Sequence, residues 1–474
     1  MVDAEMHDGP RGRGTRRRAP RVLLIGMDIA DGELVDRWCR DGHLPNLRAL
    51  REAGAWGRPG TTADSMHVSA WPTLHTGTFP GRHGIYHAYQ VRPGSRGIQR
   101  AEAEMCAVPP FWKHLDAAGR RSIVFDAFFT YPIEPFAGIQ VHEYGTWTWF
   151  TEPATTPPGL RAEIRRRFGA YPFPEHTKVL TVPEPRWLRD RLRMAVGVKT
   201  EAVRALLREE PWDFFYVTYA ETHAAGHYLW HVMDDSHPAH DVAESEGLRE
   251  ALRDVYAAVD GAIGALVRDA GDGTTVLVVS ADGMGPNYAG CNLVAPVLRR
   301  LGLLFESGVA PEEGRAGTAR PKKGILSTAR ELVPLSFRRE VTKRLPRALH
   351  YRMSTRWASY GIDWERTQAY VVPNANEGYV RLNLEGREPG GTVEPGTEAD
   401  ELLDRIASAF AECVNPATGE KAVASIVRAS EVFAGPEAGS LPDLVIAWNS
   451  AAKILGEIES PTLGPVRTPA GYES

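Results

Sequence analysis

Short β-branched or aromatic runs alternate with helix-period segments along most of this chain. Helical patterns such as Leu44–Gly54 and Leu248–Val267 lie next to these runs. Strands that alternate with helices are typical of a largely parallel sheet covered by helices, so the sequence predicts an α/β fold. The runs with the composition of buried strands are Val22–Ile25, Ser122–Phe125, Phe214–Thr218 and Val276–Ser280.

The first predicted strand leads directly into Asp28, and further along the chain the hydroxyl-rich segment Ser69-Ala70-Trp71-Pro72-Thr73 enters a helix. Open α/β sheets bind ligands beyond the carboxyl ends of their strands. Backbone N–H groups at a turn that enters a helix suit an anion. The two features together indicate metal-assisted chemistry on a phosphate or similar ester.

Two further strand ends carry side chains that can bind a metal ion. After the run that ends at Tyr219, a helix from Thr222 would place His223, His227 and His231 on one face, so that two of them converge on one ion. Asp282 follows the last apolar run and precedes glycines, which permit close backbone approach. We therefore expect a metal site at this edge of the sheet.

Composition limits the class of protein. A chain of 474 residues with 43% hydrophobic residues can bury a large core, and we expect one elaborated domain. A net charge of -5 does not indicate that the protein binds a nucleic acid polymer. The four cysteines are scattered without CxxC spacing, which argues against a disulfide framework and favours the cytoplasm. Residues 1–20 are polar and Arg-rich, and the apolar run behind them is too short for a signal peptide or a membrane span, so we expect a disordered basic tail and no membrane association.

An ordered series of motifs resembles the type I phosphodiesterase/nucleotide pyrophosphatase family of the alkaline phosphatase superfamily. The resemblance runs from about residue 21 to 305 and resumes from Asn376 to Leu444. It implies an alkaline-phosphatase-like α/β/α sandwich, two divalent metal ions, commonly zinc, and a Ser or Thr nucleophile that forms a covalent intermediate. The motifs are Gly26-Met27-Asp28, Gly42-His43-Leu44-Pro45-Asn46-Leu47, Ala70-Trp71, Thr76-Gly77, Pro80-Gly81-Arg82-His83-Gly84-Ile85, Glu221-Thr222-His223 to His227, and Asp282-Gly283-Met284-Gly285.

The resemblance also suggests how the chain is divided. We expect a core over 21–305, a basic, partly helical insertion or cap over 306–365, and the remainder of the core over 366–474. The family's last His ligand, in a Gly-x-His context, has no counterpart here, because no His follows His350.

The position that the resemblance assigns to the nucleophile is occupied by His67, which is not a hydroxyl residue. Ser65 and Ser69 flank it, and Ser69 lies nearer the predicted start of the helix. His67 could itself attack and form a phosphoramidate, or it could bind the metal. The candidate catalytic groups are therefore Ser69, His67, Ser65 and a metal-bound water.

The metal ligands also depart from the family pattern. The family's Asp-x-x-x-His pair matches His223 and His227, and its Asp-His pair matches Ala281 and Asp282. The imidazoles and carboxylates that remain suit zinc or another divalent ion, and they suffice for one ion rather than two. The predicted metal ligands are Asp28, His223, His227 and Asp282.

Two functions are compatible with these residues. The first is a metal-dependent hydrolase or transferase of phosphate esters, with phosphodiester or nucleotide-type small molecules as substrates. The second is a divergent or catalytically degenerate member that binds an anionic small molecule or performs a different transfer reaction. Arg381 and Asn376 are candidate ligands of the substrate's anionic group, with an ion pair between Arg381 and Glu377 as the alternative. The oligomeric state is not predicted.

Overall fold

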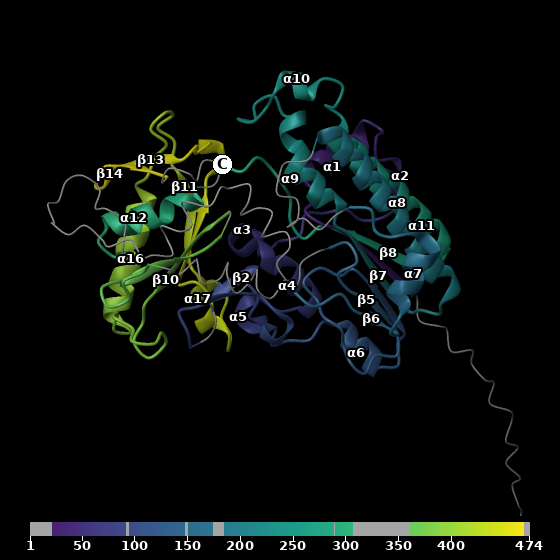
Figure 1. Ribbon diagram of the computed structural model, residues 1–474, viewed down its shortest axis with the longest axis horizontal. Helices are drawn as coiled ribbons and strands as arrows, with labels where there is room; N and C mark the ends of the chain where they lie inside the picture. The colour runs from purple at the N-terminus through teal and green to yellow at the C-terminus, as the bar shows by residue number, and fades with distance from the viewer. Residues whose placement is uncertain are drawn as a thin grey trace, which may run out of the picture.

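The computed structural model describes residues 21–91, 94–146, 150–173, 184–288, 290–306, 361–374 and 376–468. This part of the chain forms two lobes, which lie side by side in Figure 1. The larger lobe contains a six-stranded sheet and the smaller one a four-stranded sheet. The predicted tail over 1–20 and nearly all of the predicted insertion over 306–365 lie outside the described residues.

The six-stranded sheet confirms the predicted α/β class. Its order is β6-β5-β4-β7-β1-β8, and every neighbouring pair is parallel except β5 and β6. The central strands β7 and β4 are buried along their whole length, as continuous apolar runs in a parallel sheet require. The strands are β1 (Arg21–Met27), β4 (Ser122–Phe125), β5 (Ile139–Val141), β6 (Thr155–Thr156), β7 (Phe214–Tyr219) and β8 (Thr274–Val279).

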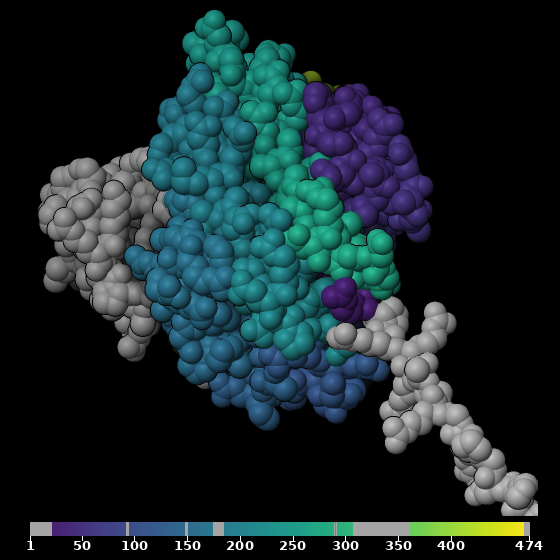
Figure 2. Space-filling view, turned by 90° about the vertical axis from the view of Figure 1, so that its right-hand side faces the viewer, coloured from purple at the N-terminus to yellow at the C-terminus, as the bar shows by residue number. Residues whose placement is uncertain are grey.

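Helices cover both faces of this sheet, which gives the expected α/β/α layers (Figure 1). Leu23 and Ile25 of β1 face a core that includes Leu192 of the long helix α8, while Leu24 faces the opposite core with Trp71 and Trp112. Figure 2 shows the outer surface of the first layer, where α8, α9 and α11 lie beside α1 and α2. The first layer contains α1 (Gly32–Arg40), α2 (Pro45–Ala53), α7 (Leu160–Phe168), α8 (Pro185–Glu209), α9 (Glu221–Met233) and α11 (Ala251–Ala270), with the short α10 (Val242–Ser245) after α9; α6 (Trp112–Ala117) lies on the other face.

A run of short helices joins the two lobes. It contains α3 (Ala63–Met66), a 3-10 turn (His67–Ser69), α4 (Ala70–Thr76) and α5 (Pro80–His83), and α3 lies between the lobes in Figure 1. Trp71 of α4 lies directly on β1, because a Cβ atom added to Gly26 would come within 2.8 Å of its ring. Gly26 therefore allows this segment to approach the strand that ends at Asp28.

The smaller lobe has its own core. Its sheet has the order β11-β12-β10-β9 and is antiparallel throughout, and α12 and α16 pack against it. The segment 366–474, expected as the remainder of the core, thus contributes a second sheet rather than further strands of the first. The elements are β9 (Ala369–Val372), β10 (Gly378–Leu382), β11 (Val423–Arg428), β12 (Leu444–Trp448), α12 (Val294–Arg300), α16 (Thr397–Ala411) and α17 (Ala429–Val432), with the ribbons β2 (Tyr89–Val91)/β3 (Ile98–Arg100) and β13 (Glu457–Ser460)/β14 (Gly464–Arg467) nearby.

Every helix within the described ranges is too short or too polar to cross a lipid bilayer.

Candidate active site

Three neighbouring strands end at the same edge of the large sheet and present the predicted ligands there. Asp28 directly follows β1, α9 with its histidines follows β7, and Asp282 lies in the loop after β8. The parallel register pairs Met27 with Tyr219 and Gly26 with Val279, so the three strand ends are level with one another. The topology therefore gathers residues that are far apart in the sequence.

Asp28 is fully buried, and both of its carboxylate oxygens are engaged. Oδ1 accepts a hydrogen bond from Trp71 Nε1 at 2.6 Å, and Oδ2 lies 2.6 Å from His223 Nδ1. The Thr222 hydroxyl donates to the Asp28 backbone carbonyl at 2.7 Å, which ties α9 to the end of β1. A carboxylate on Nδ1 fixes the orientation and tautomer of an imidazole, so Asp28 directs Nε2 of His223.

His223 and His227 converge as the helical spacing predicted. Their Nε2 atoms lie 2.7 Å apart on adjacent turns of α9. Two nitrogen lone pairs directed at one point repel each other unless a proton or a cation lies between them. His231, the third histidine of the series, instead contacts Glu244 Oε2 at 3.5 Å and does not join this pair.

The loop that carries Asp282 packs closely against the same helix. A Cβ atom added to Gly226 would lie 2.2 Å from Met284 Sδ, so the chain beyond Asp282 rests on α9 where a glycine leaves room. Asp282 Oδ1 is buried without a hydrogen-bond partner. Burial raises the pKa of Asp282 well above its ordinary value, and the nearby charges of Asp28 and Glu377 add to the effect. A cation would compensate the buried Asp282 carboxylate.

The described residues contain no group of three or more His, Cys, Asp or Glu side chains already assembled around one point. The donor set nevertheless fits one divalent ion. Two imidazole nitrogens converge, the carboxylate of Asp282 lacks a partner, and Asp28 supplies the supporting carboxylate behind His223. Trp71 Nε1 and His223 Nδ1 each contact one oxygen of Asp28, so this carboxylate orients the His223 imidazole.

His67 lies beside Glu377, which comes from the smaller lobe. Its Nδ1 atom is 3.0 Å from Oε2 and 3.2 Å from Oε1 of Glu377, and Asn374 Nδ2 donates to Oε2 at 2.6 Å. Burial disfavours the charge of Glu377, but the hydrogen bonds from His67 and Asn374 outweigh it and lower the pKa of this carboxyl below its ordinary value. His67 and Glu377 thus form an imidazole–carboxylate pair across the two lobes.

The two candidate serines are placed differently. Ser69 is fully buried, and its hydroxyl donates to the Met66 carbonyl at 2.6 Å and contacts the Thr62 hydroxyl at 2.7 Å. Ser65 is partly exposed, and its carbonyl accepts from the Tyr379 hydroxyl at 3.2 Å. The hydroxyl of Ser69 therefore stabilises the turn before α4, and this placement argues against the expected attack by Ser69.

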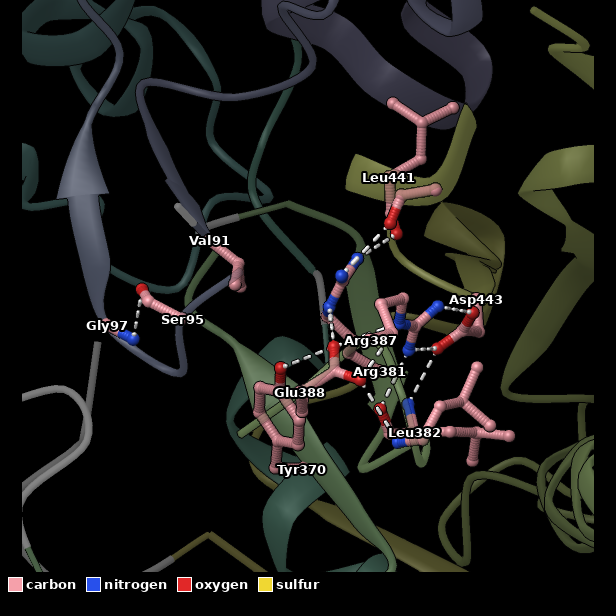
Figure 3. A network of polar contacts seen from close by, with 12 residues as sticks. Val91, Ser95, Gly97, Tyr370, Arg381, Leu382, Arg387, Glu388, Leu441 and Asp443 are labelled. Carbon is pink, nitrogen blue, oxygen red and sulfur yellow. Dashed lines mark hydrogen bonds and ion pairs between the residues drawn. The ribbon is translucent and has the colours of Figure 1, made fainter. Parts of the chain in front are cut away.

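Arg381 lies in the interior of the smaller lobe, as Figure 3 shows. Its guanidinium donates to Glu388 Oε1 at 2.7 Å and to the carbonyls of Leu441 at 2.6 Å and Gly439 at 3.0 Å. Its ion-pair partner is thus Glu388 and not Glu377, and these contacts argue against substrate binding by Arg381. Asn376 is exposed next to Glu377, and its backbone N–H donates to Asn374 Oδ1 at 3.0 Å.

Several residues that support the site were not identified from the sequence. Trp71 holds Asp28, and Glu377, named above only as a partner for Arg381, holds His67. Behind α9 lies a buried ionic triad of Lys199, Asp126 and Glu221. Asp126 follows a predicted strand directly, which is the signal that identified Asp28; the other pairings join segments too distant in sequence to be read from spacing.

Comparisons with known proteins agree with the motif series. The sequence model described as type I phosphodiesterase / nucleotide pyrophosphatase matches residues 22–469. None of the curated proteins is similar enough to this chain to count as a relative. Among solved structures, phosphonoacetate hydrolase from Sinorhizobium meliloti is 15% identical to this chain, and the aligned part covers 91% of this chain and 81% of that chain. The TM-score is 0.46 for its complex with phosphonoformate and 0.45 for its complex with phosphonoacetate.

TM-scores this low carry no inference about substrate or chemistry, so the assignment rests on the match of the sequence model. That match covers nearly the whole chain, including both lobes and all the strand ends described above. The chain belongs to the type I phosphodiesterase / nucleotide pyrophosphatase family, a family of phosphoester hydrolases.

Proposed function

We propose that this protein is a metal-dependent hydrolase of small-molecule phosphate esters, of the phosphodiester or nucleotide type, and that it uses one divalent ion, zinc by the chemistry of its donors. The observation that carries the proposal is the convergence of His223 and His227, at 2.7 Å between their Nε2 atoms, at the same edge of the sheet as a buried Asp282 oxygen without a hydrogen-bond partner. Two imidazoles and a carboxylate are a common set of protein ligands at a hydrolytic zinc site.

Each residue has a distinct role in this proposal. His223 and His227 would bind the ion through Nε2, and Asp282 through its carboxylate. Asp28 keeps His223 in the required tautomer from behind, and Trp71 fixes Asp28. When bound, the ion supplies a Lewis acid that neutralises charge on a phosphoryl oxygen. The burial of Asp28 beside the ligands keeps this end of the sheet in a low-dielectric environment, where such charges interact more strongly.

The test combines metal content with turnover. The purified protein is dialysed, its divalent metals are quantified, and the release of nitrophenol is measured from mono- and bis-nitrophenyl phosphate with zinc, manganese, magnesium or calcium added. We expect one bound ion per chain and metal-dependent release. His223→Ala and His227→Ala should lose both properties, because each removes a nitrogen ligand.

His231→Ala is the matched control, since it removes a histidine of the same helix that contacts Glu244 instead. It should retain metal and turnover. Wild-type protein without stoichiometric metal, and without nitrophenol release under any metal, would reject the proposal and favour a catalytically degenerate member that binds an anionic small molecule.

A further inference from the structure

We infer that His67, oriented by the Glu377 carboxylate, is the nucleophile of this site and forms a covalent phosphohistidine through Nε2. This inference rests on the proposed function, because it concerns attack on the same phosphate ester. It assigns the reacting atom, which the proposed function leaves open.

The geometry of the pair determines which ring nitrogen can attack. Glu377 Oε2 accepts from His67 Nδ1 at 3.0 Å and from Asn374 Nδ2 at 2.6 Å, and the carboxylate is almost fully buried. An ionised carboxylate can only accept hydrogen bonds, so the proton of a neutral His67 lies on Nδ1. The lone pair is then on Nε2, which has no hydrogen-bond partner within the described part of the chain.

The segment that precedes His67 contacts the loop of the proposed metal ligand Asp282. The side chain of His67 is 20% exposed, whereas that of Glu377 behind it is 8% exposed, so the imidazole is the accessible member of the pair. The Thr61 hydroxyl donates to the Ala281 carbonyl at 2.7 Å, which joins the segment before His67 to the loop of Asp282.

The neighbouring hydroxyl is unsuited to attack. Ser69 is inaccessible to solvent, and its proton is directed to the Met66 carbonyl, with the Thr62 hydroxyl on its other side. Neither contact is a base that would take the proton in the reaction, so Ser69 lacks the partner that an activated serine requires. His67 has both access and an orienting carboxylate.

The reaction consists of two displacements at phosphorus. In the first, the Nε2 lone pair forms the P–N bond while the P–O bond to the leaving alcohol breaks, and the departing oxygen takes a proton from water. In the second, a water oxygen attacks phosphorus, the P–N bond breaks, its electrons return to Nε2, and the proton of the water is released to solvent. Nδ1–H stays hydrogen-bonded to the Glu377 carboxylate throughout, and this carboxylate offsets the positive charge that develops on the ring.

The adduct is the first test. The metal-loaded enzyme is mixed with mono-nitrophenyl phosphate, quenched in alkali, and analysed by intact mass and by peptide mapping. A phosphoryl group on an imidazole survives alkali and is lost in acid, whereas a phosphoserine behaves in the opposite way. We expect an alkali-stable adduct on His67, which Ser69→Ala retains and His67→Ala lacks. An acid-stable adduct that disappears in Ser69→Ala would overturn the inference.

The second test separates attack from structural support. Free imidazole should restore nitrophenol release to His67→Ala, because it fills the same space and forms phosphoimidazole. His67→Ala and His67→Gln should keep wild-type metal content and a cooperative unfolding transition, although both lose the hydrogen bond to the buried Glu377 carboxylate. Loss of the metal in folded His67→Gln would show that His67 is a ligand instead.

Glu377→Gln tests the positioning residue. It should lower kcat by about 10²–10⁴-fold with little change in KM, since the carboxylate acts through His67 and does not contact substrate. If the wild-type enzyme releases nitrophenol and His67→Ala does so equally fast, this inference fails while the proposed function stands. If the wild-type enzyme releases none, both fail.

Discussion

Replacing Lys199 by Met should destabilise this protein strongly, although Met preserves most of the length of the side chain. Lys199 is fully buried on the inner face of α8, and its ammonium lies 3.0 Å from Asp126 Oδ2 and 3.4 Å from Glu221 Oε1. It also donates to the Thr218 carbonyl at 3.1 Å. Burial opposes its charge, but the two carboxylates outweigh that effect and raise the pKa of Lys199 above its ordinary value.

The two carboxylates of this triad differ in their other partners. Asp126 accepts from the backbone N–H groups of Tyr144 at 2.8 Å and Gly145 at 2.7 Å, and it keeps these two donors when Lys199 is replaced. Glu221 accepts from Tyr171 at 2.8 Å, but its Oε2 atom is buried without a hydrogen-bond partner. Burial already raises the pKa of Glu221, against the attraction of Lys199. In Lys199→Met we therefore expect Glu221 to take up a proton.

The protonation of Glu221 determines how much stability Lys199→Met loses. Removing one member of a buried ion pair costs about 3–5 kcal/mol in the free energy of unfolding. Keeping a carboxyl with an ordinary pKa of about 4.3 neutral at pH 7 costs about 3.7 kcal/mol, at about 1.36 kcal/mol per pH unit. The two values together place the expected loss in the free energy of unfolding at about 3–5 kcal/mol at pH 7. In the variant the folded-state pKa of Glu221 lies above its unfolded value, so the difference from wild type should shrink to about 1 kcal/mol at pH 5.

Urea unfolding, followed by tryptophan fluorescence at pH 7 and pH 5, measures both quantities. The control is Lys199→Met combined with Glu221→Gln, which removes one charge of each sign and leaves Asp126 with its backbone donors. It should recover much of the stability lost at pH 7. A loss below about 1 kcal/mol at pH 7, or a loss that is the same at both pH values, would refute the electrostatic argument, because lost packing alone does not titrate.

Three further outcomes follow from other contacts. Trp71→Phe removes the hydrogen bond to Asp28 Oδ1 and should weaken metal binding by about 10–100-fold, measured by competition with a chelator; unchanged affinity would separate Asp28 from the metal site. Gly226→Ala places a methyl group against Met284 and should lower the free energy of unfolding by about 1–3 kcal/mol in urea, whereas a neutral result would mean that the loop moves freely. Burial lowers the pKa of His75 to about 3, so the free energy of unfolding should fall by about 1.4 kcal/mol for each pH unit below pH 6.5. His75→Gln should show a smaller decrease in acid titrations of stability, and an unchanged decrease would contradict this.

Much of the larger lobe could be predicted from local patterns. The four strand predictions match β1, β4, β7 and β8 within a few residues, because strands of a largely parallel sheet carry continuous apolar runs, although β8 lies at the edge of the sheet and is only partly buried. The helical spacing of His223 and His227 likewise predicted their convergence, since residues four apart on a helix share a face. The segment 366–474 was expected to complete the core, but a local pattern does not say which sheet a strand joins, and the strands of this segment form a second sheet.

The sequence by itself determined the α/β class, the family and the edge of the sheet where the predicted ligands gather, because these depend on periodicity and on motifs read in order. Only the tertiary structure decided what each polar side chain contacts. It buried the hydroxyl of Ser69, paired Arg381 with Glu388, and brought Glu377 of the smaller lobe to His67. Such pairings depend on how two separate cores pack together, and no local pattern encodes that distance. The sequence pointed to Asp28 as a site residue, and the structure adds that its carboxylate contacts His223.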